Sequence, residues 1–296
     1  MKITPLLNSR VVAGIFCAGA VLFMAAGASA QNLYDSEQYS GAIDVFNSSG
    51  TPTTFIPSTQ PLGKQIAFDS SGDLFVGNNG TAGITKITPN GTASSFGSGF
   101  NEPSGVAVNG AGDVFVANTG NGEIIEVALN GSESLFATGL DNPGFLTFNS
   151  AGDLLEADSG SGNIYEFAPN GMKTLYASGF QIPVGLAFNS AGDLFVANGL
   201  SQNAGYISEM TPSGTSTILT GLDGPQGLAV NNAGDLFIAV AIGYIEEITP
   251  AGASVFSTQV QSPIGLAFAP VPEPSTLALL AVGASAVALR LRRKKN

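Results

Sequence analysis

Histidine and tryptophan are absent from the 296 residues, and cysteine occurs once, as Cys17. Without histidine, the chain lacks the side chain that most often acts as a general base near neutral pH. Cys17 lies in an N-terminal apolar run that we expect to be removed, so the mature chain has no thiol for a disulfide, a nucleophile or a metal site. These absences favour a non-enzymatic role over acid–base or thiol catalysis.

Positive charge is also scarce in the body of the chain. Between residues 31 and 270 the only cations are Lys64, Lys86 and Lys173, against 21 acidic residues, which gives a formal charge of −18. Such a body repels phosphate backbones, so nucleic acid is excluded as a partner. The acids are interpreted as a solvated surface, and the alternative is that they recruit cations or a basic partner.

The first 30 residues predict a secretory signal peptide. Lys2 and Arg10 supply the positive start, residues 11–27 are apolar, and residues 28–30 form a small-x-small cleavage pattern. We expect signal peptidase to cut between Ala30 and Gln31, which makes 1–30 a leader. The residues before Cys17 make a poor lipoprotein box, so acylation of that cysteine is not expected.

A unit of about forty residues fills the region 31–270. Its clearest copy, residues 184–198, reads Val-Gly-Leu-Ala-Phe-Asn-Ser-Ala-Gly-Asp-Leu-Phe-Val-Ala-Asn. The aspartate of the Gly-Asp pair recurs with steps of 40, 40, 40 and 42 residues, at Asp73, Asp113, Asp153, Asp193 and Asp235. A fixed period of this size indicates a repeat architecture.

Each unit predicts four short antiparallel strands. In the clearest copy the first strand is residues 185–188 and the second is residues 194–197. The third strand is seen in the preceding unit at residues 164–167, where apolar and polar residues alternate. An Asn-Gly pair such as Asn90-Gly91 joins the third strand to the fourth, and we expect both of its residues to take positive φ in a two-residue hairpin turn. Four such strands per unit make a propeller blade.

The number of pieces predicts how the ring closes. First strands begin near six positions: Ile66, Val106, Leu146, Leu186, Leu228 and Leu266. The Gly-Asp turn occurs only five times, and the missing one falls between Phe268 and Leu33. We therefore predict an all-β, six-bladed β-propeller over 31–270, in which the last repeat supplies one strand and the N-terminus supplies three strands of a shared blade. Pairing the two chain ends inside one blade removes the unpaired edges that an open ring would have, and the propeller is expected to be a monomer.

The motif Pro-x-Gly-Leu-Ala-Phe-x-x-x-Gly-Asp-Leu-Phe-Val-Ala-Asn, ending at Asn198, resembles the NHL repeat and related six-bladed propellers. The streptogramin lyase-like and gluconolactonase-like groups are among these relatives. The resemblance implies the fold and leaves the function open, because such blades serve many roles. Lyases of the first group are expected to use histidine, which this chain lacks.

Periodic residues are interpreted as scaffold. The five periodic aspartates are expected to be turn residues whose carboxylates accept local backbone N–H bonds, with metal binding as the alternative. The recurring glutamates of the third strand are expected to be solvated; they are Glu126, Glu166, Glu209 and Glu247.

Breaks in the period are the candidate functional positions. Glu156 stands where other units have valine or isoleucine, and Asp158 stands where Asn118 and Asn198 stand in theirs, so both acids project from one face of a strand. In the family that this chain resembles, the end of the second strand lies near the channel mouth, which implies that Glu156, Asp158, Asn118 and Asn198 are candidate ligands of one Ca²⁺. The alternative is that Glu156 is half-exposed and Asp158 is an ordinary loop acid, with no cofactor bound.

Two further breaks concern loops and the channel rim. The loop 199–205 is three residues longer than its equivalents. The variable position inside Pro-x-Gly is expected to rim one channel mouth and to form a mixed surface suited to binding; its residues are Lys64, Ser104, Gly144, Val184, Gln226 and Ile264.

Residues 271–296 form a separate segment. They begin with Val271, Pro272, Glu273 and Pro274, continue with an apolar run shorter than the roughly 20 residues of a membrane span, and end in a basic cluster. This order resembles the PEP-CTERM sorting signal of Gram-negative bacteria. The resemblance implies a short transmembrane segment, recognition by an exosortase-type membrane transpeptidase, and delivery to the cell envelope or extracellular matrix. A plain C-terminal membrane anchor is the alternative.

The sequence therefore predicts an exported, exosortase-sorted propeller with a non-enzymatic binding or structural role, with exopolysaccharide or another surface protein as its partner. The alternative is a metal-dependent lactonase or lyase of the gluconolactonase or streptogramin lyase-like propeller group.

Overall fold

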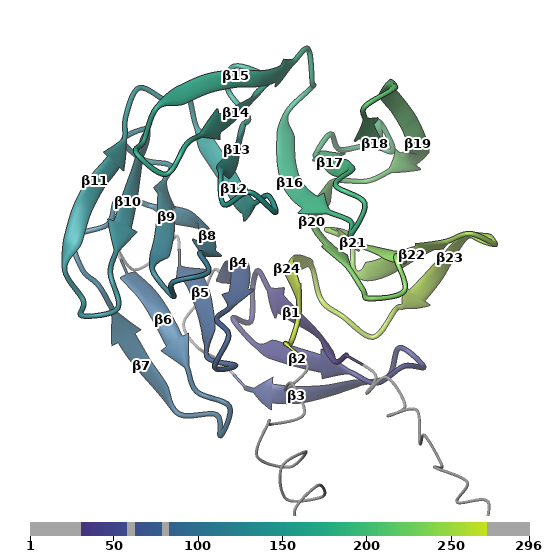
Figure 1. Ribbon diagram of the computed structural model, residues 1–296. Coiled ribbons are helices and arrows are strands. Elements are labelled where there is room, and N and C mark those ends of the chain that lie inside the picture. The colour runs from purple at the N-terminus through teal and green to yellow at the C-terminus, as the bar shows by residue number, and fades with distance from the viewer. Residues whose placement is uncertain (1–30, 58–62, 79–82, 271–296) are drawn as a thin grey trace, which may run out of the picture.

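The computed structural model describes residues 31–57, 63–78 and 83–270 as a closed ring of six four-stranded antiparallel sheets, which confirms the predicted six-bladed propeller (Figure 1). The predicted signal peptide and the predicted sorting segment lie outside these residues. Within the described ranges, the structure contains no helix of the length and apolar character needed to cross a membrane.

We name the sheets blades A to F in ring order. Blade A contains β24 (Pro263–Phe268), β1 (Leu33–Glu37), β2 (Ile43–Phe46) and β3 (Pro52–Ile56). Blade B contains β4 (Gly63–Phe68), β5 (Leu74–Asn78), β6 (Gly83–Ile87) and β7 (Ala93–Phe96). Blade C contains β8 (Pro103–Val108), β9 (Val114–Asn118), β10 (Glu123–Val127) and β11 (Glu133–Ala137).

The other three blades follow the same order. Blade D contains β12 (Pro143–Phe148), β13 (Leu154–Asp158), β14 (Asn163–Phe167) and β15 (Lys173–Ser178). Blade E contains β16 (Pro183–Phe188), β17 (Leu194–Asn198), β18 (Gly205–Thr211) and β19 (Gly214–Leu222). Blade F contains β20 (Pro225–Val230), β21 (Leu236–Val240), β22 (Tyr244–Thr249) and β23 (Gly252–Ser257).

The hydrophobic core is divided among the six interfaces between neighbouring blades. Each of the six clusters of buried side chains joins two adjacent blades, as in the cluster of Leu154 and Phe167 from blade D with Phe115 and Ile124 from blade C. The second strand is buried along its whole length in blades B to F, whereas the outermost strands are mostly exposed. This explains why second strands are continuous apolar runs and third strands alternate.

Aromatic rings reinforce several of these interfaces. Phe115 in β9 makes edge-on contacts with Phe136 of its own blade and with Phe148 of blade D, at centroid distances of 4.9 and 5.2 Å. Phe237 in β21 does the same with Phe256 and with Phe268 of blade A, at 5.0 and 5.3 Å. Edge-on pairs of this kind contribute about 0.5–1.5 kcal/mol each beyond area burial.

Ring closure follows the predicted shared blade. β24 pairs antiparallel with β1, with Leu33 opposite Phe268 and Asp35 opposite Leu266. The backbone N–H of Gln38 donates to the Ser262 carbonyl at 3.1 Å and extends this pairing. In Figure 1 the yellow strand β24 lies beside the purple strand β1. The two ends of the ring therefore meet inside one sheet.

Glycine in the innermost strand lets neighbouring blades approach closely. A Cβ at Gly185 would lie 1.9 Å from the Gln226 carbonyl oxygen of the next blade, and one at Gly105 would lie 2.2 Å from the Gly144 carbonyl oxygen. Both contacts are far below van der Waals distance, so these positions require glycine. The Gly of Pro-x-Gly is thus set by inter-blade packing.

The turns between the first and second strands differ from expectation in which side chain accepts the backbone bonds. In blade D the Asn149 side-chain oxygen accepts from the N–H groups of Ala151 and Asp153 at 2.9 Å each, as in an Asx turn. The Asp153 carboxylate in turn accepts from the Asn149 side-chain amide at 3.1 Å. Asn109, Asn189 and Asn231 repeat this arrangement. The expected backbone-accepting role thus belongs mainly to the asparagine four residues before the aspartate.

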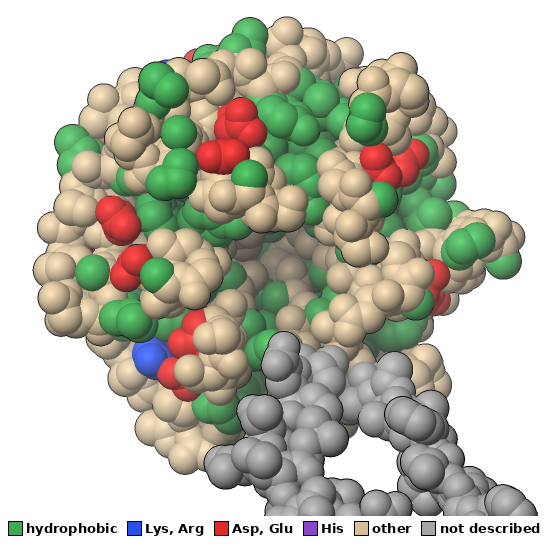
Figure 2. Space-filling model, in the orientation of Figure 1, with side chains coloured by type: hydrophobic (Ala, Val, Ile, Leu, Met, Phe, Trp, Pro, Cys, Tyr) green, Lys and Arg blue, Asp and Glu red, His purple; other side chains and the backbone are tan. Residues whose placement is uncertain are grey.

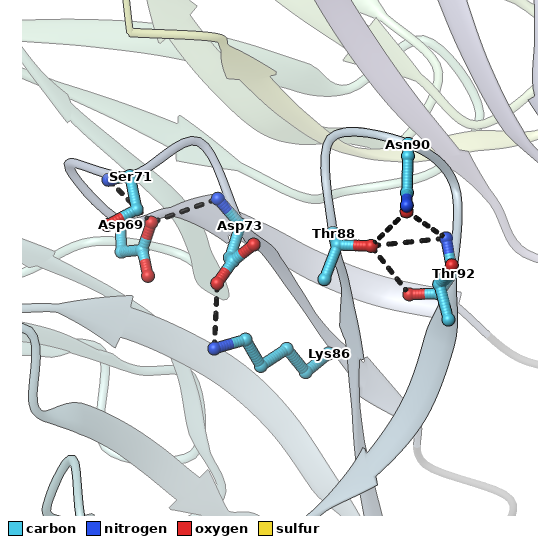
Figure 3. Close-up of polar contacts among 7 residues, drawn as sticks. All are labelled: Asp69, Ser71, Asp73, Lys86, Thr88, Asn90 and Thr92. Carbon is cyan, nitrogen blue, oxygen red and sulfur yellow. Dashed lines mark hydrogen bonds and ion pairs between the residues drawn. The ribbon is translucent and has the colours of Figure 1, made fainter.

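Blade B uses a different donor at this turn (Figure 3). Asp69 replaces the asparagine and still accepts from Ser71 and Asp73 N–H groups, at 2.8 and 2.9 Å. A carboxylate cannot donate to Asp73, and Lys86 instead places its Nζ 2.7 Å from the Asp73 Oδ2. Lys86 stands where the other blades carry the third-strand glutamates, which are half-buried rather than solvated. The Asn-to-Asp change is therefore compensated by a local cation.

The Asn-Gly hairpin turns are also corrected in detail. Gly91 has φ +83°, whereas Asn90 does not have positive φ. Gly91 N–H donates to the Thr88 carbonyl and Thr88 N–H donates to the Thr92 carbonyl, while the Asn90 side chain accepts from Thr92 N–H (Figure 3). Asparagine is thus the second central residue and glycine follows it in the left-handed region, as in a type I turn with a G1 bulge.

Deleting residues 261–268 removes β24 and leaves β1 as an unpaired inner edge of an open ring. We expect the protein to lose its cooperative thermal transition, measured by circular dichroism, because both the clasp and the interface between blades F and A lose their inner strand. An unchanged transition would contradict closure by β24.

The Lys86–Asp73 pair can be tested by a double-mutant cycle. Lys86→Met is expected to destabilise the protein by about 0.5–1 kcal/mol, because a partly exposed ion pair to Asp73 is lost. In an Asp69→Asn background the same change should cost much less, because the new amide donates to Asp73 as in the other blades. Equal costs in both backgrounds, measured by urea unfolding, would refute the compensation.

Candidate binding site at the polar mouth of the channel

The six innermost strands surround a central channel with two dissimilar openings. The wide mouth, of about 420 Å³, is lined by the second halves of the inner strands, including Ile66, Leu146 and Leu228. We call the opposite opening, of about 310 Å³, the polar mouth; its lining includes Lys64, Ser104 and Gln226. Figure 2 shows a hollow at the ring centre, with carboxylates distributed over separate blades around it.

Gln65 bridges inner strands along this channel. Its side-chain oxygen accepts from the N–H groups of Val106 and Leu146 at 3.0 and 2.8 Å, and its amide donates to the Leu146 carbonyl at 2.6 Å. β4 is thereby tied to β12, two blades further round the ring. Four blades have glycine at the equivalent position, so this brace is particular to blade B.

The polar mouth contains five of the six predicted rim positions. Lys64, Ser104, Gly144, Val184 and Gln226 line it, one from each of blades B to F. Ile264 of blade A is the exception, because it is 3% exposed and is not among the lining residues. The variable position of Pro-x-Gly therefore faces the channel mouth in most of the ring.

Sequence reasoning missed several residues of this mouth. Thr119 and Ser159 directly follow the second strands, and Asn142 precedes β12. Thr119 Oγ1 donates to the Pro143 carbonyl at 2.8 Å and contacts Ser104 Oγ, while Ser159 Oγ donates to the Asn142 carbonyl at 3.0 Å. The only signal for Thr119 and Ser159 in the sequence is their position, one residue after the repeated Asn or Asp, and that for Asn142 is its position before the first-strand proline.

Backbone strain is concentrated beside the same mouth. The residue before the first-strand proline has positive φ in blades C, D, E and A, where it is Glu102, Asn142, Ile182 and Ser262, with φ between 51 and 65°. A residue before proline favours extended backbone, and non-glycine residues in the left-handed region cost of order 1 kcal/mol or more. Such strain persists only where neighbouring contacts hold it.

In blades D, E and A those contacts come from the last residue of the second strand, whereas Asn118 Oδ1 in blade C has no hydrogen-bond partner. Asp158 Oδ2 accepts from Asp141 N–H at 2.8 Å, and Asn198 Oδ1 accepts from Gln181 N–H at 3.2 Å. In blade A, Glu37 Oε1 accepts from Gln261 N–H at 2.8 Å. Asp158 and Asn198 thus share a repeated structural role, which is to anchor the loop that leads into the strained residue.

Glu156 lies two residues before Asp158 in β13, so it does not correspond to the asparagines at the ends of the second strands in other blades. It is fully buried in β13, so the half-exposed alternative for it is wrong, and Asp158 is 1% exposed within the same strand rather than in a loop. Glu156 Oε1 accepts from Gly144 N–H at 3.3 Å, whereas its Oε2 has no hydrogen-bond partner. Burial raises the pKa of Glu156 well above its usual range, and the neighbouring Asp158 raises it further.

The four residues that were predicted to bind Ca²⁺ lie in three different blades. Glu156 and Asp158 are neighbours in blade D, whereas Asn118 lies in blade C and Asn198 in blade E. None of the four is among the residues that line the polar mouth. Among the described residues, no three histidine, cysteine or acidic side chains are arranged to hold a metal ion. The predicted Ca²⁺ site remains a prediction.

The long loop of blade E is confirmed by strand register. Asn198 pairs with Tyr206, whereas the equivalent residues Asn118 and Asp158 pair with Glu123 and Asn163, so the hairpin is three residues longer. Gln202 N–H donates to Asp223 Oδ1 at 2.7 Å, which ties the loop to the approach to blade F.

The polar mouth has few charged side chains among its lining residues. Burial lowers the pKa of Lys64, the one cation among its lining residues, and Glu102 is the one carboxylate. Hydroxyl and amide groups supply most of the remaining polar side chains, next to the ring of Phe145. An opening of this kind can hydrogen-bond a polar ligand from several sides.

Comparisons with known proteins agree with this architecture. The model of the NHL repeat matches residues 100–125, and the model of the PEP-CTERM protein-sorting motif matches residues 270–294. None of the functionally curated proteins matches the sequence.

Solved structures share the fold at low sequence identity. A chain of a nidogen–laminin complex is 16% identical with a TM-score of 0.71, covering 81% of this chain and 98% of that one. A streptogramin B lyase is 18% identical with a TM-score of 0.64, covering 80% and 84%. A virginiamycin B lyase from Staphylococcus aureus is 20% identical with a TM-score of 0.60, covering 79% and 84%.

The sorting motif implies export, processing by an exosortase and sorting to the cell surface. Together with the six closed blades, these findings show that the chain is a six-bladed β-propeller with NHL-repeat character and a C-terminal PEP-CTERM sorting motif.

Proposed function

We propose that this protein is a non-enzymatic binding protein of the cell envelope or extracellular matrix, and that its polar mouth binds a carbohydrate of that matrix. The observation that carries the proposal is the convergence of hydroxyl and amide side chains from several blades on one opening. Carbohydrates present many hydroxyl groups, which both donate and accept hydrogen bonds, and such groups match them.

The charge of the propeller limits the class of carbohydrate that the polar mouth can bind. With three lysines against 21 acids between residues 31 and 270, the surface potential disfavours polyanions. Neutral glycans are therefore the better ligands, and glycans rich in uronic acid are expected to bind more weakly. A sorting motif that implies delivery to the cell surface would place the propeller where such polymers are found.

A metal-dependent lactonase or lyase is the second candidate. Its support is the buried Glu156 Oε2 without a hydrogen-bond partner, next to Asp158. This carboxylate would need further oxygen ligands to hold a hard cation such as Ca²⁺. Its requirement for a metal separates it from the carbohydrate-binding role.

Calorimetric titration of the propeller with neutral oligosaccharides tests the proposal. Gln226→Ala and Ser159→Ala are each expected to weaken binding by about tenfold, because each removes a hydrogen-bonding group from the polar mouth. Ser150→Ala, at an exposed turn between β12 and β13, is the matched control and should leave affinity unchanged. If all three variants bind oligosaccharides with the affinity of the unmodified protein, binding at this mouth is refuted. Tight one-site binding of Ca²⁺ that is lost in Glu156→Gln would instead support the metal-dependent candidate.

Glu273→Gln tests the sorting part of the proposal. The variant is expected to accumulate as an unprocessed, membrane-associated precursor, because it changes the acidic residue of the matched motif. Immunoblotting of cell fractions measures this, and Ser275→Ala, directly after the Pro-Glu-Pro residues 272–274, is the control. Normal processing of the Glu273→Gln variant would count against exosortase recognition.

A further inference from the structure

The second strand of the closing blade is chemically unlike those of the other blades. β1 carries Asp35, Ser36 and Glu37 at the positions of Val116, Ala117 and Asn118 in β9. All three side chains of β1 are buried, with exposed fractions of 0%, 0% and 6%. Two of them form the bonds that close the ring, since Ser36 Oγ accepts from Gly265 N–H at 3.0 Å and Glu37 accepts from Gln261 N–H.

Asp35 has no such bond. Neither of its carboxylate oxygens has a hydrogen-bond partner, and the same is true of Oδ1 of Asp44, which is 7% exposed. Asp44 in β2 lies directly opposite Asp35 in the strand register. Side chains at directly opposed positions have Cβ atoms about 4.5–5.5 Å apart, so the two carboxyl groups lie side by side on one face of the sheet. Two buried carboxylates this close cannot both be ionised at low cost.

The surroundings offer little compensation for negative charge. On β1 itself Glu37 adds a like charge, but its own oxygens accept from Gln261 N–H and Ser40 Oγ. β24 and β3 have no titratable side chain, and Lys64 on β4 lines the polar mouth while its carbonyl accepts from Ser36 Oγ. Burial raises the pKa of Asp35 well above its usual range, and Glu37 and Asp44 raise it further. The nearby Ile264 N–H lowers this pKa, although it does not reach hydrogen-bond geometry with either carboxylate oxygen. Burial also raises the pKa of Asp44, and a hydrogen bond from Thr54 opposes this.

We propose that Asp35 and Asp44 form a proton-dependent latch that holds the ring closed most firmly in acid and loosens it as the pH rises. Protonation lets one carboxyl group donate a hydrogen bond to the other across the β1–β2 pair. Loss of the proton places two like charges beside the β24–β1 seam, which is the one place where the ends of the propeller meet. The latch thus acts on ring closure itself.

The direction of the pH dependence follows from proton linkage. Asp35 in the folded protein binds its proton more tightly than in the unfolded chain, where the pKa is about 3.9. Between that value and the higher folded pKa, the folded state holds more protons, so the free energy of unfolding falls as pH rises. The stability is therefore greatest in acid, opposite to the usual effect of a salt-bridged aspartate.

A cation is the alternative occupant of this pair. Ca²⁺ takes six to eight oxygen ligands, more than these two carboxyl groups supply. A second observation also disfavours a bound cation. Among the described residues, no three acidic, histidine or cysteine side chains are arranged to hold a metal ion. The third acid of the region, Glu37, is already used to close the ring. A proton shared by two carboxyl groups needs fewer oxygen atoms around it than Ca²⁺ does.

The test compares thermal unfolding between about pH 5 and pH 8 for the propeller of residues 31–270, which contains every strand of the six blades. The Tm of the unmodified protein should fall across this range. Asp35→Asn, which mimics the protonated group, should make that fall smaller. Asp35→Val, which copies blades B, C and E, should raise the Tm most at the alkaline end. Glu126→Gln removes one half-buried charge elsewhere and should leave the slope unchanged.

A local measurement identifies the seam. Hydrogen exchange followed by mass spectrometry, corrected for the intrinsic pH effect, should show β24 losing protection before β13 as the pH rises, and Asp35→Asn should abolish the difference. An unchanged Tm slope in Asp35→Asn, or simultaneous loss of protection in β24 and β13, would overturn the latch. A Tm increase on adding Ca²⁺ at neutral pH that is absent in Asp35→Asn would also overturn it, in favour of a bound cation.

Discussion

Pairing of β24 with β1 is the interaction on which the rest of the structure depends. The hydrophobic core is distributed over six interfaces between neighbouring blades, and the interface between blades F and A is complete only if the ring is closed. A single unpaired seam would expose strand edges and the interface between blades F and A together. The side chains of Ser36 and Glu37 add bonds to this seam that the backbone ladder alone would not supply.

Closure also decides where ligands can bind. Neighbouring inner strands approach within the distance that only glycine permits, and the cavities lie at the two ends of the ring that these strands form. The polar mouth lies where the period is weakest, at the variable position of Pro-x-Gly and at the strained residue before each proline. Strain there is held by buried anchors such as Asp158 and Asn198, which explains why polar residues recur at the ends of buried strands.

Buried carboxylates occur at equivalent places in two blades that face each other across the ring. Asp35 and Glu37 in blade A correspond to Glu156 and Asp158 in blade D. In both pairs the second acid anchors a loop and the first lacks a full set of hydrogen bonds. The cost of burying such acids is several kcal/mol when they are charged, so their presence needs a reason beyond stability.

Residue order along the chain was enough to predict the blade count, the four strands per blade and the shared closing blade, because a forty-residue period and a missing Gly-Asp turn are properties of that order. The variable position of Pro-x-Gly likewise identified most of the channel rim. The burial of Glu156, the role of Asn149 rather than Asp153 as acceptor of the turn's backbone bonds, and the register that places Asp35 opposite Asp44 became known from the fold. These facts depend on which strands lie side by side and at what register, and burial and hydrogen bonding across strands cannot be read from local residue order.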